Sequence, residues 1–170
     1  MTVLGRRKLP PGAPRRLDLT RVDLRGVRLG GANLQGAVLE GANLQDAWLV
    51  ADLQDAVLEG ANLQSAWLGG AGLQGAHLYR ANLQGAKLTF ANLPHAKLNG
   101  ADLQGAQVVD ADLQGVRLGG ANLQGAVLEG ANLQGARANK DTRWPAGWTP
   151  ETAKDRGVLY PPYPQGSRPD

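Results

Sequence analysis

The chain has no cysteine, one phenylalanine, one methionine and two histidines among its 170 residues, and these shortages exclude several classes of function. Without cysteine there is no disulfide framework and no thiolate to act as nucleophile or metal ligand, which fits a reducing compartment. With two histidines and only two serines, Ser65 and Ser167, no pair of nucleophile and base is recognisable. We therefore expect a protein that is not an enzyme and holds no cofactor.

Long apolar runs are also missing, so we expect no membrane contact. The first residues, Met1 to Lys8, lack the apolar stretch of a secretion signal, and we expect a cytoplasmic protein. A mixed globular core is not expected either. The 24 glycines, set against single Phe and Met residues, are typical of a repeat protein.

What the chain does contain is a five-residue unit, read as A-N/D-L-Q-G alternating with A-x-L-x-G, from Leu17 to Lys140. There are 25 units, and the central residue is Leu in 23 of them, the exceptions being Val108 and Ala138. One residue is missing from the register after Val50. We expect the chain to turn more tightly at that point.

A period of five fits neither a helix nor a continuous strand. Five steps of about 100° advance a helix by about 140°, so the leucines would ring it on every side. In a strand, an odd period points successive leucines to opposite faces of the sheet. If the chain turns a corner once per unit, the first and third residues of each unit both face inward. Each unit then forms one side of a polygonal coil.

A longer repeat gives the number of sides. Residues 37–55 recur as residues 56–75, so that four units repeat as a set, with Trp48 matching Trp67 and Glu40 matching Glu59. Such matches are expected when equivalent residues lie above one another on successive coils of a four-sided solenoid. The units of residues 17–140 would then make about six coils.

With this pattern the chain resembles the pentapeptide repeat family, whose motif is A(D/N)LXX. The resemblance implies an all-β fold, a right-handed quadrilateral parallel β-helix solenoid in which the central Leu and the Ala two residues before it point inward. Departures from the small Ala are few: Leu17, Val22, Val27 and Val116. The interior positions include Leu34, Leu44, Leu63, Leu83, Leu103 and Leu123.

Segments of different composition flank the repeats. Residues 1–16 form a basic, proline-rich arm, residues 17–140 the repeat solenoid, and residues 141–170 a C-terminal cap and extended tail. Thr149 before Pro150 is typical of a helix start, and Gly157 of a helix end. The sequence therefore predicts a short helix from Pro150 to Arg156 that, with Trp144 and Trp148, caps the apolar end of the last coil.

The repeat does not explain a group of outward residues, Arg28, Trp48, Trp67 and Lys87, that should stack on one side of the coils. One interpretation is that the indoles stack across coils and stabilise that side. The other is a surface that binds an unidentified protein partner, because Trp and Arg are enriched at binding hot spots. A second, weaker candidate is the irregular region that contains His77, Tyr79, Arg80, Lys87, Phe90, Pro94 and His95. His77 and His95 occupy different positions of their units, so we expect no shared metal site.

Charge divides unevenly along the chain, whose net charge is +3. Arg6, Arg7, Lys8, Arg15 and Arg16 make the arm basic, and nucleic-acid contact through it is one alternative function. The first half of the repeats contains an acidic group, Glu40, Asp46, Asp52, Asp55 and Glu59.

The family resemblance implies a further alternative, a DNA-mimicking protein that interacts with DNA gyrase. The small negative balance of the repeats argues against it. A homodimer through a coil end is a further hypothesis. The leading interpretation is a non-enzymatic structural or protein-interaction module.

Overall fold

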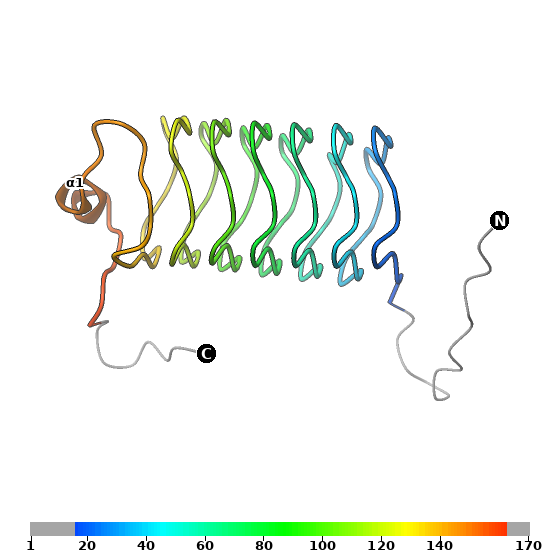
Figure 1. Cartoon of the computed structure of the whole chain (residues 1–170), viewed down its shortest axis with the longest axis horizontal. Coiled ribbons are helices and arrows are strands. Elements are labelled where there is room, and N and C mark those ends of the chain that lie inside the picture. Colours follow the sequence, from blue (N-terminus) through cyan, green and yellow to red (C-terminus); the bar gives the residue numbers. More distant parts are fainter. Residues whose placement is uncertain (1–15, 163–170) are drawn as a thin grey trace.

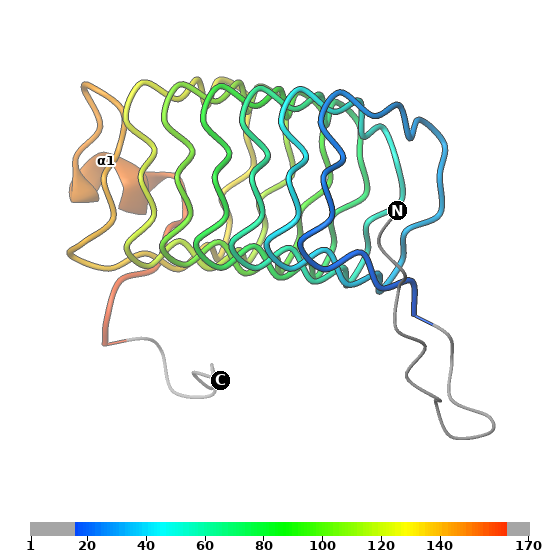
Figure 2. The same ribbon diagram turned by 45° about the vertical axis from the view of Figure 1, so that its right-hand side comes forward.

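The computed structural model describes residues 16–162, which form a rod of stacked coils (Figure 1). The first coil lies at one end of the rod, and the helix α1 (Pro150–Asp155) lies at the other. Figure 2, turned by 45°, shows the coils following one another along the same axis. Residues 1–15, and with them all of the predicted basic arm except Arg16, lie outside the described residues, as do residues 163–170.

Parallel bridges join each coil to the next, and most partners are 20 residues apart, which corresponds to four five-residue units per coil. Each bridge involves one residue per coil, so the described residues contain no longer strand. The bridges form four ladders, each named here by its first residue. They are the Asp18 ladder (Asp18, Val38, Val57, His77, Lys97, Arg117, Arg137, Leu159), the Asp23 ladder (Asp23, Asn43, Asn62, Asn82, Asp102, Asn122, Arg143), the Arg28 ladder (Arg28, Trp48, Trp67, Lys87, Gln107, Val127) and the Asn33 ladder (Asn33, Asp52, Gly72, Asn92, Asp112, Asn132).

Tight turns connect the ladders at the corners. At a typical corner the N–H of Ala42 donates to the carbonyl of Leu39 at 3.0 Å, and Gly41 has a φ of 60°. A positive φ at the third of four turn residues is what a type II turn requires, and glycine adopts it without steric cost. The glycine that ends most units therefore makes the corner, as the repeat predicts.

The interior consists of the Leu and Ala ladders that the repeat predicts. Leu44, Leu63, Leu83 and Leu103 are buried, and each immediately follows a residue of the Asp23 ladder, so they stack on successive coils. Leu34 and Leu123 are buried as well. The N–H of Leu83 donates to the carbonyl of Asp102 on the next coil at 2.7 Å. Backbone hydrogen bonds between coils thus hold a close-packed apolar interior.

The residue missing after Val50 shortens one corner. There the N–H of Ala51 donates to the carbonyl of Leu49 at 2.8 Å, two residues back instead of three. This is the hydrogen bond of a three-residue turn, and the bridge from Trp48 to Trp67 spans 19 residues instead of 20. The expected tightening is present, and all four ladders continue past it.

Asn and Asp residues on the outside stabilise the corners. The side-chain oxygen of Asn62 accepts from the N–H of Gln64 at 3.2 Å, and its amide donates to Asn43 on the preceding coil at 3.1 Å. The first is the local bond that Asn side chains form in turns, and the second joins neighbouring coils. Asn92 departs from the pattern because the residue two positions later is Pro94, which has no N–H to donate.

The C-terminal segment packs against the last coil. Thr149 and Thr152 form a capping box, with the Thr152 hydroxyl accepting from the N–H of Thr149 at 2.8 Å, and Pro150 begins α1. Ala153 and Val158 are buried in the same apolar cluster as the coil interior, and Trp144 and Trp148 pack against it. In the part of the chain that is described, no helix is long and apolar enough to cross a membrane.

Candidate functional site: an exposed apolar surface on the Arg28 ladder

Exposed apolar side chains gather on one ladder. Five large apolar residues of the described chain are exposed, and Trp48, Trp67 and Val127 among them belong to the Arg28 ladder. A fourth, Phe90, ends the unit that contains Lys87, so it lies at the corner beside the same ladder. The fifth, Leu17, is in the first coil. Concentration of exposed apolar area on one surface is characteristic of a contact site.

The two tryptophans stack as the sequence predicts. Their ring centroids are 4.8 Å apart with an interplanar angle of 14°, and the ammonium of Lys87 lies 4.2 Å from the Trp67 centroid. Offset stacking contributes about 0.5–1.5 kcal/mol, and a cation over an exposed indole about 0.5–1 kcal/mol. The exposed fractions are still 44% for Trp48 and 40% for Trp67. Stacking therefore fixes the orientation of the rings and covers one face of each, and part of each side chain stays exposed.

A shallow depression adjoins the tryptophans. It has a volume of about 340 Å³ and lies around the shortened corner, between Val50 and Ala51 on one coil and Gly31 and Gly70 on the coils beside it. The Trp48 ring lies close to Gly30, the residue before Gly31, and the Trp67 ring lies close to Gly69, the residue before Gly70. The depression results from the missing residue, together with Gly72 at an outward position where the other coils carry Asn or Asp.

Phe90 is held in a conformation that its side chain disfavours. Its φ is 60° at the corner position where most units have glycine, and the residue is 67% exposed. A left-handed conformation costs roughly 1–2 kcal/mol for a residue with a β-carbon, and the exposed ring returns little hydrophobic stabilisation. The fold itself therefore does not favour phenylalanine here.

Replacing Phe90 with glycine is expected to raise the free energy of unfolding by about 0.5–1 kcal/mol, because glycine adopts a positive φ without strain. Urea denaturation followed by circular dichroism measures the change. Gly105→Phe, at the equivalent corner position of the Asp23 ladder with a φ of 66°, is the reverse control and should destabilise. A loss of stability in Phe90→Gly would mean that the ring contributes to the fold.

The other residues singled out in the sequence are not brought together. Glu40 and Glu59 stack at one corner, after the Asp18 ladder, whereas Asp46 lies at the next corner and Asp52 on the Asn33 ladder. Asp55 lies at a fourth position, the corner after that ladder. The acidic group therefore forms no continuous face.

The two histidines are also separate: His77 lies on the Asp18 ladder, and His95 lies at the corner that follows the Asn33 ladder. Burial, and secondarily the charge of Lys97, lowers the pKa of His77. Among the described residues no group of three or more potential ligands could hold a metal ion.

Sequence reasoning missed two parts of the surface. Val127 follows Trp67 by three coils, so the spacing alone places it on the Arg28 ladder. It was not predicted as part of the surface because a valine does not stand out among apolar repeats. The depression was not predicted, because a missing residue has no side chain to reveal its effect. Arg28 bridges Trp48 at the N-terminal end of the ladder, as predicted.

Comparison with known proteins identifies the repeat. A family model described as pentapeptide repeats matches in eight copies, over residues 18–50, 68–105, 76–115 and 106–140. A comparison with curated proteins gave no significant match.

Solved structures of pentapeptide repeat proteins are similar to the chain. HetL, from the cyanobacterium Nostoc sp. strain PCC 7120 and described as involved in heterocyst differentiation regulation, is 43% identical over 72% of this chain and 60% of its own, with a TM-score of 0.51. The chain thus spans 60% of the length of HetL. Rfr23, from the cyanobacterium Cyanothece 51142, is 31% identical over 75% of this chain and 90% of its own, with a TM-score of 0.42. QnrB1, a plasmid-mediated fluoroquinolone resistance protein, is 20% identical over 85% and 82%, with a TM-score of 0.49.

Proposed function

Because the chain belongs to the pentapeptide repeat family, we propose that it is a non-enzymatic interaction module whose contact surface is the Arg28 ladder. The observation that supports this most is the concentration of exposed apolar residues there: Trp48, Trp67, Val127 and, at the adjoining corner, Phe90. The repeat places small or apolar residues inside and turn formers at corners, and it requires no aromatic residue at these outward positions.

The chemistry of this surface suits a protein partner. Trp and Arg are the residues most enriched at binding hot spots, and the rings of Trp48 and Trp67 are held in one orientation by stacking and by Lys87. A preorganised aromatic pair loses little conformational entropy on binding. The adjoining depression of about 340 Å³ has room for an apolar side chain of the partner.

The finer architecture that we propose is a right-handed, quadrilateral β-helix capped by α1. The four bridge ladders support the four-sided section, and the burial of Ala153 against the last coil supports the cap. Interaction with DNA gyrase finds no support in the positions of the acidic residues, since Glu40, Asp46 and Asp52 occupy separate corners and ladders. A gyrase supercoiling assay with purified protein tests that alternative, and inhibition or protection would favour it.

The double variant Trp48→Ala, Trp67→Ala tests the proposal. Lost stacking should lower the free energy of unfolding by no more than about 2 kcal/mol. Binding to the partner should weaken by 2 kcal/mol or more, about thirtyfold, if both rings are hot spots. Affinity capture identifies the partner, and titration calorimetry with the purified partner measures the loss.

Gln104→Ala, Gln124→Ala is the matched control, because both side chains are exposed on the corner that follows the Asp23 ladder. It should leave both stability and binding within about 0.5 kcal/mol of the wild type. Unchanged affinity in the tryptophan variant, with a lowered melting temperature, would show that the pair serves only to stabilise the rod.

A further inference from the structure

The depression at the shortened corner contains one charged side chain. Its volume is about 340 Å³, and Asp52 is the only ionisable residue among the described residues that line it. Apart from Asn33, the rest of the lining is apolar or has no side chain: Gly31, Ala32, Val50, Ala51, Gly70 and Gly72. The depression is therefore an apolar hollow with a single carboxylate in its lining.

Asp52 lacks a hydrogen bond that an equivalent aspartate receives. Its Oδ1 accepts from the N–H of Gln54 at 3.0 Å, which is the bond of the local turn. On the same ladder, Asp112 accepts in addition from the amide of Asn132 on the next coil at 3.0 Å. The residue that follows Asp52 on its ladder is Gly72, which has no side chain to donate. The carboxylate of Asp52 therefore borders the depression with a hydrogen-bonding capacity that the next coil does not use.

The missing donor is not replaced by a cation of the chain. No lysine or arginine of the described residues forms an ion pair with Asp52. Arg28 and Lys87 lie on the neighbouring ladder, and residues 29–79, which include the whole lining, contain no lysine or arginine. The same residues contain five acidic side chains, Glu40, Asp46, Asp52, Asp55 and Glu59. The segment that forms the depression therefore favours a cationic ligand.

The backbone does not require glycine at residue 72. Gly72 is not among the glycines that have a positive φ, so a residue with a β-carbon adopts its conformation without strain. A β-carbon there would lie 3.6 Å from Oδ1 of Asp52, which is an ordinary contact, and 3.3 Å from Oε1 of the flexible Gln74. The other coils carry Asn or Asp at this position of the ladder. What glycine contributes is therefore the open space beside the carboxylate.

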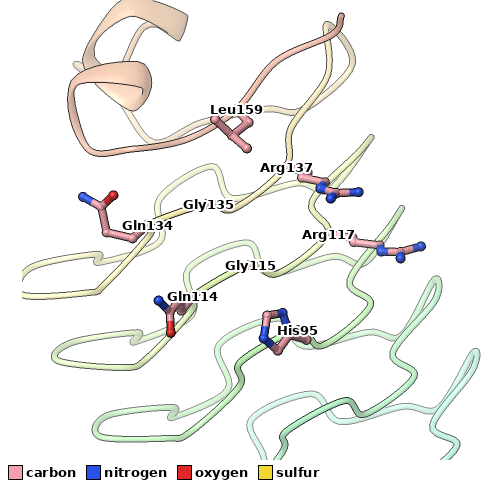
Figure 3. Close-up of a pocket in the computed structure, with 8 residues that line it drawn as sticks. All are labelled: His95, Gln114, Gly115, Arg117, Gln134, Gly135, Arg137 and Leu159. Atoms are coloured by element: carbon pink, nitrogen blue, oxygen red, sulfur yellow. The ribbon is translucent and has the colours of Figure 1, made fainter. Parts of the chain in front are cut away.

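A larger groove of the rod has a different character. Its volume is about 500 Å³, and its lining includes Arg117 and Arg137. None of the described residues that line it is acidic. Figure 3 shows the two guanidinium groups pointing away from Gln114 and Gln134, which line the same groove. Of the two hollows, the depression is the one that presents a carboxylate to a cation.

The depression also adjoins the aromatic pair. A β-carbon on Gly30 would lie 3.5 Å from Nε1 of Trp48, and one on Gly69 would lie 3.4 Å from Nε1 of Trp67. The residues directly after these two glycines belong to the lining of the depression. A partner that covers the indole rings therefore reaches the depression on the same surface.

We propose that the depression receives an arginine side chain of the partner, whose guanidinium binds the carboxylate of Asp52 and whose methylene stem lies against Val50 and Ala51. This inference rests on the proposed function, because it needs a partner on the Arg28 ladder. A guanidinium presents a planar fork of donors that matches a carboxylate, and arginine is enriched at binding hot spots. Its stem covers apolar surface while its charge reaches a polar group. A purely apolar side chain would fill the depression and leave Asp52 without the missing donor.

Titration of the isotope-labelled full chain with two capped tripeptides, followed by NMR, tests the inference. The probes are acetyl-Gly-Arg-Gly-amide and its norleucine counterpart, which has an apolar side chain. The arginine peptide should shift the amide resonances of Ala51, Asp52 and Gly72 saturably at millimolar concentration. The norleucine peptide should bind about fivefold more weakly or less, because it cannot pair with the carboxylate. No saturable shift of these resonances, or equal binding of the two peptides, would overturn the inference.

A charge variant locates the site. Asp52→Asn removes the charge and keeps the oxygen that accepts from the N–H of Gln54, so the turn is preserved. It should weaken binding of the arginine peptide about fivefold or more. Asp112→Asn makes the same substitution on the same ladder, three coils away, and should change the affinity less than twofold. An equal loss in the two variants would show that the peptide responds to net charge and not to this site.

Filling the space beside Asp52 is the complementary test. Gly72→Asn supplies the amide that Asn132 gives to Asp112, so it should raise the melting temperature. Because the new side chain occupies the depression and its carboxylate, binding of the arginine peptide should weaken about tenfold or more. A raised melting temperature with unchanged peptide affinity would mean that the arginine binds elsewhere.

The purified partner distinguishes this inference from the proposed function. Asp52→Asn should weaken binding of the partner about fivefold or more. If its affinity is unchanged and the Trp48→Ala, Trp67→Ala variant loses the partner, the arginine site is wrong and the contact surface stands. If Asp52→Asn loses the partner and the tryptophan variant does not, the arginine site stands and the aromatic pair is not the contact.

Discussion

Replacing Leu83 with lysine is expected to unfold the rod or to lower its free energy of unfolding by about 3 kcal/mol or more. Leu83 is 1% exposed and stacks between Leu63 and Leu103 in the interior. An ammonium group there would have no partner, since only Leu and Ala ladders surround it, and it would interrupt the contact between coils on both sides. Urea denaturation followed by circular dichroism measures the change.

Gln84→Lys, one residue further along, is the matched control. The amide of Gln84 already donates to the carboxylate of Asp102 at 2.6 Å, and a lysine in its place has the same carboxylate within reach on the outside of the coil. Its stability should stay within about 0.5 kcal/mol of the wild type. Equal destabilisation by the two lysines would mean that the assignment of inside and outside positions is wrong.

Replacing Ala153 with arginine is expected to lift α1 from the end of the rod and to cost about 2–4 kcal/mol. Ala153 is fully buried in the cluster that includes Val158, so a long charged side chain has no room there. Loss of the cap exposes the apolar end of the last coil, where Leu133 and Ala136 are buried. Amide hydrogen exchange should therefore rise first in the last coil, ahead of global unfolding.

Asp155→Arg is the control on the same helix. Asp155 is the exposed last residue of α1, and a cation is favourable at a helix C-terminus. Exchange in the last coil should not change in this variant. If Ala153→Arg left that exchange unchanged as well, α1 would not act as a cap.

Most of the interior could be predicted from the period of the sequence. Because a period of five cannot place the leucines on one face of a helix or strand, only a turn in every unit brings Leu63, Leu83 and Leu103 together. The match of Trp48 with Trp67 then indicates four units per coil. The corners follow as well, because glycine recurs where φ must be positive. The helix predicted from Thr149 and Pro150 forms as Pro150–Asp155, one residue shorter than expected, with Arg156 as its C-terminal cap residue.

The surfaces were less predictable, because they depend on residues from several coils. The stacked indoles were foreseen from their spacing. A groove of about 500 Å³ was not foreseen, because its lining joins Arg117 and Arg137 of the Asp18 ladder to Leu159, which lies beyond the repeats. The five-residue period ends before Leu159, so it does not predict the coil against which Leu159 packs. The depression arises from the residue missing after Val50 and from Gly72, and neither feature indicates a contact site in the sequence.

The most direct test of the central claim, that a partner binds the Arg28 ladder, is site-specific photocross-linking. A photoreactive phenylalanine at Gln107, which is exposed on the Arg28 ladder between Lys87 and Val127, is compared with one at Asn122 on the Asp23 ladder. The partner should be cross-linked from position 107 and not from position 122, and the band should disappear when Trp48 and Trp67 are both alanine. Cross-linking of the partner from position 122 alone, or equally from both positions, would contradict the account.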